Sequence, residues 1–311
     1  MKFPLLNASI VAVFLWSGLP TTIMFACGEA HCPENVASVT PRIIAGALLV
    51  VPVKVNQSGP FDFMVDSGSQ ITVVNPSLAF QLNLKGRGTV GLLATASYVQ
   101  ASAAELDSLE VGSHVVEKPL VVVQDLGLIQ ATDPRIRGVL GENFLSHFDF
   151  LIDYPRKLLC LDDAQVIERT IHGEHIPLMA PEHPEDQLRF TDRLVISAHL
   201  SDTGNQEIFL QLDSGSDGPI LFAGNKKLEE PLLKHATLRE GNASQAQRAF
   251  AFLPSQELRI GHHTLSNVHF VTPVSAAQNI PHRDEDGVLP TVLFQRVFIS
   301  SAKHYAIFDP R

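Results

Sequence analysis

Residues 66–69 and residues 213–216 both read Asp-Ser-Gly-Ser, and each segment follows a run of apolar residues. A single Asp-Ser-Gly triplet is ordinary turn chemistry, because the Asp side chain accepts a backbone N–H and glycine tolerates unusual backbone angles. Two such Asp residues that face each other can do more than stabilise a turn. Two neighbouring carboxyl groups repel each other when both are ionised, so one of them keeps its proton. The ionised carboxylate can take a proton from water while the protonated one polarises a carbonyl group. This chemistry suits attack of water on an amide without a covalent intermediate.

A third acid-hydroxyl-glycine triplet, residues 202–204, is assigned to a turn. The offset of 147 that aligns Asp66 with Asp213 places this triplet on residues 55–57. Both segments precede an apolar run that leads into the Asp, as a hairpin turn precedes a strand. Asp202 is therefore predicted to lie on an outer hairpin, away from the two Asp turns.

The repeat extends beyond the two Asp turns, and its blocks keep the same order in both halves. Such an internal repeat indicates two copies of one structural unit. Short apolar runs punctuated by Gly and Pro predict many short strands in each copy. A short helix is predicted from Pro76 to Leu82 in the first copy, and another after the GVLG or GVLP segment of each copy. The matching blocks are residues 106–123 with 255–272, 137–145 with 286–294, and 158–163 with 305–310.

The repeat and the charge pattern together predict the domain boundaries. A signal peptide precedes a short linker, and two homologous lobes follow, separated by a polar connection. The predicted segments are a signal peptide over 1–26, an N-terminal linker over 27–41, a first lobe over 42–165, an inter-lobe linker over 166–190 and a second lobe over 191–311.

The residues FMVDSGS with GVLG, and LQLDSGS with GVLP, resemble those of retropepsin-like aspartic proteases, with two lobes in one chain as in pepsin-like enzymes. The resemblance covers nearly all of residues 42–311. It implies an all-β fold of two β-barrel-like lobes with the active site in the cleft between them. It also implies an aspartic endopeptidase that acts on a peptide or protein substrate as a monomer and needs no metal or cofactor.

The resemblance implies that Asp66 and Asp213 are the catalytic pair. The hydroxyls of Ser67 and Ser214 are expected to bond across to the other lobe, and those of Ser69 and Ser216 to the outer carboxylate oxygens. A hairpin around residues 90–105 would form a flap over the substrate, with Tyr98 near its tip or simply on the surface of a strand. The second hairpin is open between a second flap and a surface loop. The supporting residues are Ser67, Gly68, Ser69, Gly141, Ser214, Gly215 and Ser216.

Two features of the second copy depart from the family pattern. Pro290 stands where the first copy has Gly141, and proline lacks an N–H and has a fixed φ. Asp217 adds a third carboxylate near the second turn. Both features favour an alternative function, a catalytically inactive protein that binds peptides in the same cleft. A carboxylate-pair glycosidase is disfavoured, because its acids must be spaced for a sugar.

Composition and the remaining motifs argue against several other classes of function. The formal net charge is −10 and there is no run of Lys or Arg, which argues against a nucleic-acid partner. Residues 86–91 match a dinucleotide-binding pattern but lack the required strand before and helix after it. The pair His172 and His175 lacks matching metal ligands at the usual spacing. The histidines at 262, 263 and 269 fit solvent-facing strand positions.

The N-terminus is typical of an export signal, with Lys2 before an apolar run over residues 8–16 and Ala26 before a cleavage point. An uncleaved membrane anchor is the alternative. Cys27 has two open fates, a disulfide with Cys32 in an oxidising compartment or a lipid that attaches the protein to a membrane. Cys160 is expected to be a buried strand residue. The predicted location is therefore periplasmic or secreted.

Overall fold

The computed structural model describes residues 31–94, 97–179, 194–200, 206–222, 236–243, 246–273 and 285–309. All of them belong to one unit, His31–Arg311. The predicted signal peptide and Cys27 lie outside the described residues, as does Asp202. Within these ranges no helix has the length and apolar character needed to cross a membrane.

The first large sheet contains all but the last two strands of the first predicted copy. Its two outer hairpins flank a centre of parallel and antiparallel pairs, and β2 (Arg42–Ile44) pairs with one inner strand. In spatial order the strands are β6 (Gly86–Ala94), β7 (Ser97–Glu105), β10 (Leu120–Val123), β5 (Thr72–Val74), β11 (Ile136–Leu140), β4 (Ser58–Val65), β3 (Leu48–Val55), β8 (Ser108–Val111) and β9 (His114–Glu117).

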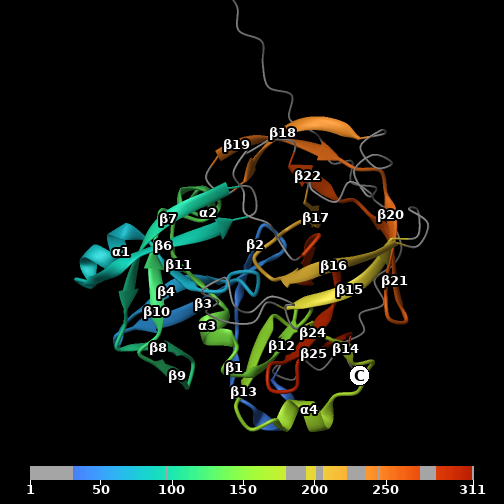
Figure 1. The fold of residues 1–311 in the computed structure, drawn as a ribbon. Helices are drawn as coiled ribbons and strands as arrows, with labels where there is room; N and C mark the ends of the chain where they lie inside the picture. The colour runs from blue at the N-terminus through green and yellow to red at the C-terminus, as the bar shows by residue number, and fades with distance from the viewer. Residues whose placement is uncertain are drawn as a thin grey trace, which may run out of the picture. The chain divides into compact units, whose positions relative to one another are not determined.

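The second large sheet has the same order of corresponding strands, position by position (Figure 1). The parallel pair that leads into Asp66, β4 with β11, has its counterpart in the parallel pair that leads into Asp213. In spatial order the strands are β18 (Thr237–Ala243), β19 (Ala246–Phe252), β22 (Val271–Pro273), β17 (Ile220–Leu221), β23 (Gly287–Pro290), β16 (Gln206–Asp213), β15 (Val195–Leu200), β20 (Gln256–Ile260) and β21 (His263–Val268).

A third sheet combines the closing strands of both halves. The strands at its centre, β12 and β24, pair antiparallel, with Phe150 opposite Ile299. Every residue of β12 is buried, as is every residue of its neighbour β13. In order the strands are β1 (Ser38–Val39), β13 (Leu158–Asp162), β12 (Asp149–Asp153), β24 (Arg296–Ser300), β25 (Tyr305–Phe308) and β14 (Ile176–Pro177).

Helices are short and few in the described residues, so the predicted all-β class is confirmed. The predicted helix after Pro76 forms as α1 (Pro76–Gln81), because the Asn75 side chain accepts the Leu78 N–H at 2.8 Å. Part of the predicted inter-lobe linker is structured, as helix α4 (Val166–Thr170) and strand β14. The other helices are η1 (Pro33–Asn35), α2 (Gly127–Thr132), α3 (Glu142–Leu145) and η3 (Thr291–Leu293).

One continuous apolar core joins the three sheets. It contains Phe63 from the first sheet, Phe150 and Ile299 from the third, and Leu210 and Leu258 from the second, all fully buried. Burying such side chains is the main favourable contribution to folding. The core therefore holds the ends of β4 and β16, which carry the two Asp turns, on a shared base.

The predicted disulfide between Cys27 and Cys32 is wrong, because Cys32 is bonded to Cys160. Strand β1 pairs antiparallel with β13, with Ser38 opposite Cys160, and this pairing brings the segment that carries Cys32 to β13. Cys160 is fully buried in its strand, as predicted. The bond links two cysteines 128 residues apart and ties the N-terminal segment to the third sheet.

Candidate active site

Each predicted Asp lies where a buried strand ends in a tight turn. Asp66 directly follows β4, and its N–H donates to the Leu140 carbonyl at 3.0 Å; Asp213 is the last residue of β16. The Asp66 carboxylate accepts the Gly68 N–H at 2.9 Å, and the Asp213 carboxylate accepts the Gly215 N–H at 2.6 Å. The turn chemistry expected from the two triplets is therefore present in both copies.

The two turns are tied to each other by Ser67 and Ser214, both buried. The Ser67 hydroxyl donates to the Leu212 carbonyl at 3.1 Å and accepts the Ser214 N–H at 3.1 Å. The Ser214 hydroxyl donates to the Val65 carbonyl at 3.0 Å and accepts the Ser67 N–H at 3.1 Å. The predicted bonds across the two halves are confirmed, and they form a reciprocal set of four.

The expectation for Ser69 and Ser216 is wrong. Their hydroxyls bond the carbonyls two residues ahead, Ser69 to Ile71 at 2.9 Å and Ser216 to Gly218 at 2.8 Å. The Ser69 N–H donates to the Asp66 main-chain carbonyl at 3.2 Å, and the backbone N–H groups of Ser69 and Ser216 act to lower the pKa of the Asp66 and Asp213 carboxyl groups. A short Ser side chain reaches its own turn more readily than an oxygen one residue further away.

The carboxyl groups of Asp66 and Asp213 lie close enough for each to affect the pKa of the other. A Cβ atom on Gly68 would lie 2.5 Å from the Asp213 Cγ, and one on Gly215 would lie 2.4 Å from the Asp66 Cγ. Each carboxyl group thus packs against the backbone of the opposite turn. Any side chain at either glycine would separate the pair.

The surroundings of the pair favour unequal protonation. Burial raises the pKa of Asp66, although its hydrogen bond with Asp213 acts in the opposite direction. Burial, then the Asp66 charge, raises the pKa of Asp213 well above its ordinary value. Both Asp residues are half-buried, so one side of the pair remains open to water. Over an intermediate pH range the pair therefore holds a single proton.

The residues behind the two turns differ between the halves. Gly141 donates its N–H to the Thr72 hydroxyl at 3.1 Å, and a Cβ there would lie 2.7 Å from the Ser69 carbonyl oxygen. Pro290 is a buried residue of β23 that pairs with Asp213 of β16, and it has no N–H to donate. The packing behind Asp213 therefore lacks one hydrogen bond that Gly141 makes behind Asp66.

Three polar side chains near the pair were not predicted from the sequence. Glu142 follows Gly141 and is buried, with the Asp66 charge acting on it. Thr291 follows Pro290, and its hydroxyl is hydrogen-bonded to that of Tyr154 at 2.6 Å. When the two copies are aligned, Glu142 corresponds to Thr291. This difference between the copies, directly after Gly141 and Pro290, was the sequence signal that could have identified Glu142.

Other predicted residues lie at the edges of the site or away from it. Tyr98 lies in β7 opposite Leu93, near the end of the β6–β7 hairpin, and its side chain is outside the described part of the structure. The β18–β19 hairpin occupies the corresponding edge of the second sheet. Asp217 is exposed. The third carboxylate near the second turn is therefore surrounded by solvent.

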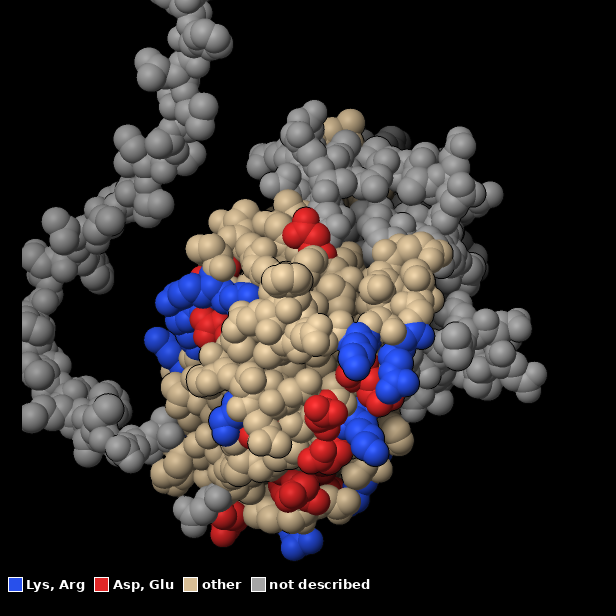
Figure 2. All heavy atoms as spheres, turned by 90° about the vertical axis from the view of Figure 1, so that its left-hand side faces the viewer, with Lys and Arg blue, Asp and Glu red and all other residues tan. Residues whose placement is uncertain are grey.

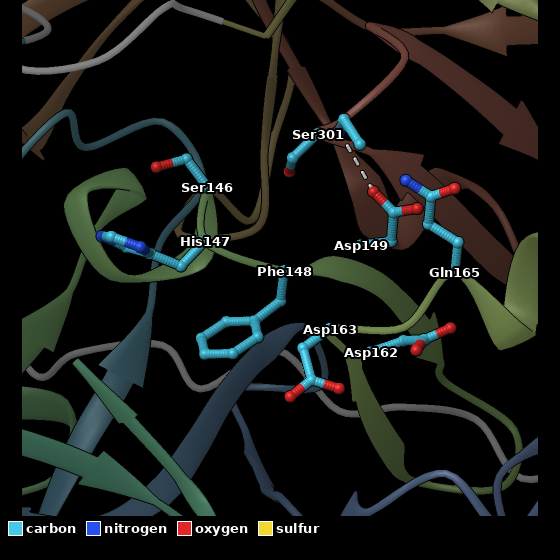
Figure 3. Close-up of a pocket in the computed structure, with 9 residues that line it drawn as sticks. Ser146, His147, Phe148, Asp149, Asp162, Asp163, Gln165 and Ser301 are labelled. Carbon is cyan, nitrogen blue, oxygen red and sulfur yellow. Dashed lines mark hydrogen bonds between the residues drawn. The ribbon is translucent and has the colours of Figure 1, made fainter.

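Within the described ranges, no group of three or more His, Cys, Asp or Glu side chains is arranged to hold a metal ion. A small pocket elsewhere includes Asp149 and Asp162 (Figure 3). The Asp149 carboxylate accepts the Ala302 N–H and the Ser300 hydroxyl, both at 3.2 Å, and Asp162 accepts the Ile167 N–H at 2.6 Å. These carboxylates stabilise local turns and the start of α4.

Charge is mixed on the face that carries the first half of the chain. Figure 2 shows Lys and Arg interspersed with Asp and Glu there, rather than gathered into one basic surface. Ion pairs in the first half of the chain include Arg42 with Asp62 at 2.6 Å and Lys54 with Glu110 at 3.3 Å.

Comparisons with known proteins point to one family. Residues 51–144 match a family model described as aspartyl protease. Among solved structures, a retropepsin-like aspartic protease from Rickettsia conorii matches with 22% identity and a TM-score of 0.30, over 40% of this chain and 88% of that chain. No curated protein matches the sequence. Residues 51–144, which contain Asp66 and Gly141, are therefore similar to the aspartyl protease family, in agreement with the resemblance expected from the sequence.

Proposed function

We propose that the protein is an aspartic endopeptidase that hydrolyses peptide bonds with water activated by Asp66 and Asp213. The observation that carries the proposal is the pair of half-buried carboxyl groups on two matching turns, each packed against the glycine of the opposite turn. The family match over residues 51–144 supports a protease of this type. The matching strand orders support the view that the chain holds two copies of one unit, each supplying one Asp.

The unequal protonation of the pair assigns a role to each Asp. Ionised Asp66 accepts a proton from water as the water oxygen attacks the carbonyl carbon of the peptide bond. Protonated Asp213 donates its proton to the carbonyl oxygen, giving a neutral tetrahedral intermediate. As the C–N bond breaks, one carboxyl donates a proton to the leaving nitrogen and the other takes one from a hydroxyl. The products are a carboxylic acid and an amine, and the pair again holds one proton.

Pro290 favours one alternative, a protein that binds peptides without cutting them. The Gly141 N–H donates to the hydroxyl of Thr72, which follows the Asp66 turn, whereas Pro290 has no N–H to make the same hydrogen bond behind Asp213. A looser second turn would leave the pair misaligned for water attack while the cleft still accepted peptides.

Incubation of the purified protein with a mixed peptide library, from acid to neutral pH, distinguishes the two functions. Mass spectrometry is expected to find new peptide termini with the wild-type protein and none with the Asp66→Asn variant. Activity is expected to survive a metal chelator, because neither proposed step uses a metal. Peptides retained but uncut by the wild-type protein would support the binding alternative.

We also propose that the protein is exported, to the periplasm or the medium. The disulfide between Cys32 and Cys160 supports an oxidising compartment, where such bonds persist. The chain has three cysteines, so this bond leaves Cys27 without a cysteine partner in the chain and keeps the lipid alternative open. Intact-mass measurement of protein from its native host tests both ideas. Removal of residues 1–26 supports export, a diacylglycerol mass on Cys27 supports membrane attachment, and a retained Met1 contradicts cleavage.

A further inference from the structure

Glu142 is the most unusual polar residue near the two Asp turns. It begins α3, is 1% exposed, and its Oε1 atom is buried without a hydrogen-bond partner. Burying a carboxyl oxygen without a hydrogen-bond partner is unfavourable, so such a group normally lowers the stability of the folded protein. The backbone N–H of Glu142 donates to the Ser69 carbonyl at 2.8 Å, and this bond holds Glu142 against the Asp66 turn.

The local structure does not need a carboxyl group at this position. The neighbouring Asn143 joins α3 to the sheet, since its side chain accepts the Thr72 N–H at 2.7 Å and donates to the Leu120 carbonyl at 2.7 Å. In the second half, the equivalent position is Thr291, which is also buried and whose hydroxyl is satisfied by Tyr154. The fold thus accommodates a neutral hydroxyl where the first half has an acid.

We propose that Glu142 is a positioning residue of the Asp66–Asp213 pair, a third carboxyl group that acts on Asp66 and makes the pair keep its single proton to a higher pH. The effect of Glu142 on catalysis rests on the proposed function. The electrostatic coupling among the three carboxyl groups is independent of whether the protein cuts peptides.

The charged groups around Glu142 support this role. Burial, and then the charge of Asp66, raise the pKa of Glu142 well above its ordinary value. On the other side of the pair, burial raises the pKa of Tyr154 to about 12, and the charge of Asp213 contributes. Strands β5 and β10, which contact this end of α3, contribute no titratable side chain. His114 and His147 lie near Phe148, beyond the other end of the helix.

Three coupled carboxyl groups lose their protons in three steps that belong to the cluster. At low pH Glu142 is neutral and does not affect the first ionisation, which creates the active, singly protonated pair. As the pH rises, a negative charge on Glu142 opposes loss of the remaining proton. The lower limb of the pH profile should therefore be independent of Glu142, whereas the upper limb should depend on it.

The test is the pH dependence of kcat/KM for the Glu142→Gln variant. Its upper limb is expected to move toward acid by about one pH unit, with the lower limb unchanged. Glu142→Asp keeps a carboxyl group and should restore the wild-type limb, and Asp217→Asn, which removes an exposed charge, should leave both limbs in place. If Glu142→Gln does not fold, Glu142→Thr reproduces the residue found at position 291. The proposal would be overturned if a folded variant had the same upper limb of the pH profile as the wild-type protein.

A carbon-13 NMR titration of Glu side-chain carboxyls separates this proposal from the proposed function. One Glu signal, absent from Glu142→Gln, should titrate well above the others, and its midpoint should fall in Asp66→Asn because the neighbouring charge is gone. That result without proteolysis would reject the endopeptidase and retain the coupling. A midpoint unchanged in Asp66→Asn would reject the coupling even if the protein cuts peptides.

Discussion

At the scale of single residues, Asp66 and Asp213 should act as one unit. Each Asp can act in catalysis only while the other is in the complementary protonation state. The losses of activity caused by substituting each one should therefore not be additive. Asp66→Asn and Asp213→Asn are each expected to lose about 10³-fold in kcat/KM or more, and the double variant should fall to a similar level. Peptide cleavage rates at the optimal pH check this. Full activity in either single variant would contradict the mechanism.

The raised pKa of Asp213 also predicts how stability depends on pH. The folded state resists ionisation of this group, whereas the unfolded chain ionises near the ordinary value. Stability is therefore lost as the pH rises above the unfolded value, and it is unaffected below that value. Asp213→Asn should raise Tm by a few degrees at pH 7 and leave it almost unchanged at pH 3. Thermal unfolding at both values tests this, with exposed Asp217→Asn as the control; a lower Tm at pH 7 would be evidence against it.

At the scale of elements, the reciprocal bonds of Ser67 and Ser214 hold the ends of β4 and β16 together. Ser67→Ala removes the donor to the Leu212 carbonyl and the acceptor of the Ser214 N–H, leaving two buried groups unsatisfied. The expected loss is about 2–3 kcal/mol of stability, together with reduced activity. Denaturant unfolding measures the loss, and Ser58→Ala, at an exposed strand position, provides the comparison. A loss no larger than that of the control would show that the bonds matter little.

At the scale of the whole molecule, the disulfide ties the N-terminal segment to the sheet shared by both halves. It closes a loop of 128 residues, and removing it frees the unfolded chain. Cys32→Ser and Cys160→Ser should each lower the free energy of unfolding by about 2–4 kcal/mol. Cys27→Ser should have no such effect. Denaturant unfolding under non-reducing conditions compares the three variants, and equal stabilities would refute a stabilising bond.

The sequence by itself determined the features that depend on local pattern. Short apolar runs between turn residues identified the strands, because Gly and Pro interrupt regular structure and apolar β-branched residues favour strands. The paired Asp-Ser-Gly segments predicted both tight turns, since Asp and Gly bond and bend the backbone within a few residues. The repeat also predicted that Ser67 and Ser214 bond across to the opposite half, because each copy presents the same turn.

Tertiary structure alone decided the features that depend on groups far apart in the chain. Cys32 pairs with Cys160 because β1 joins the third sheet, a contact that no local spacing encodes. The hydroxyls of Ser69 and Ser216 turn back to their own loops, and only the packed turns show that backbone N–H groups reach the carboxyls instead. Glu142 is an ordinary acid in the sequence, and it becomes a buried third carboxyl only because α3 packs against the Asp66 turn. Burial and proximity set its protonation, and both are properties of the folded chain.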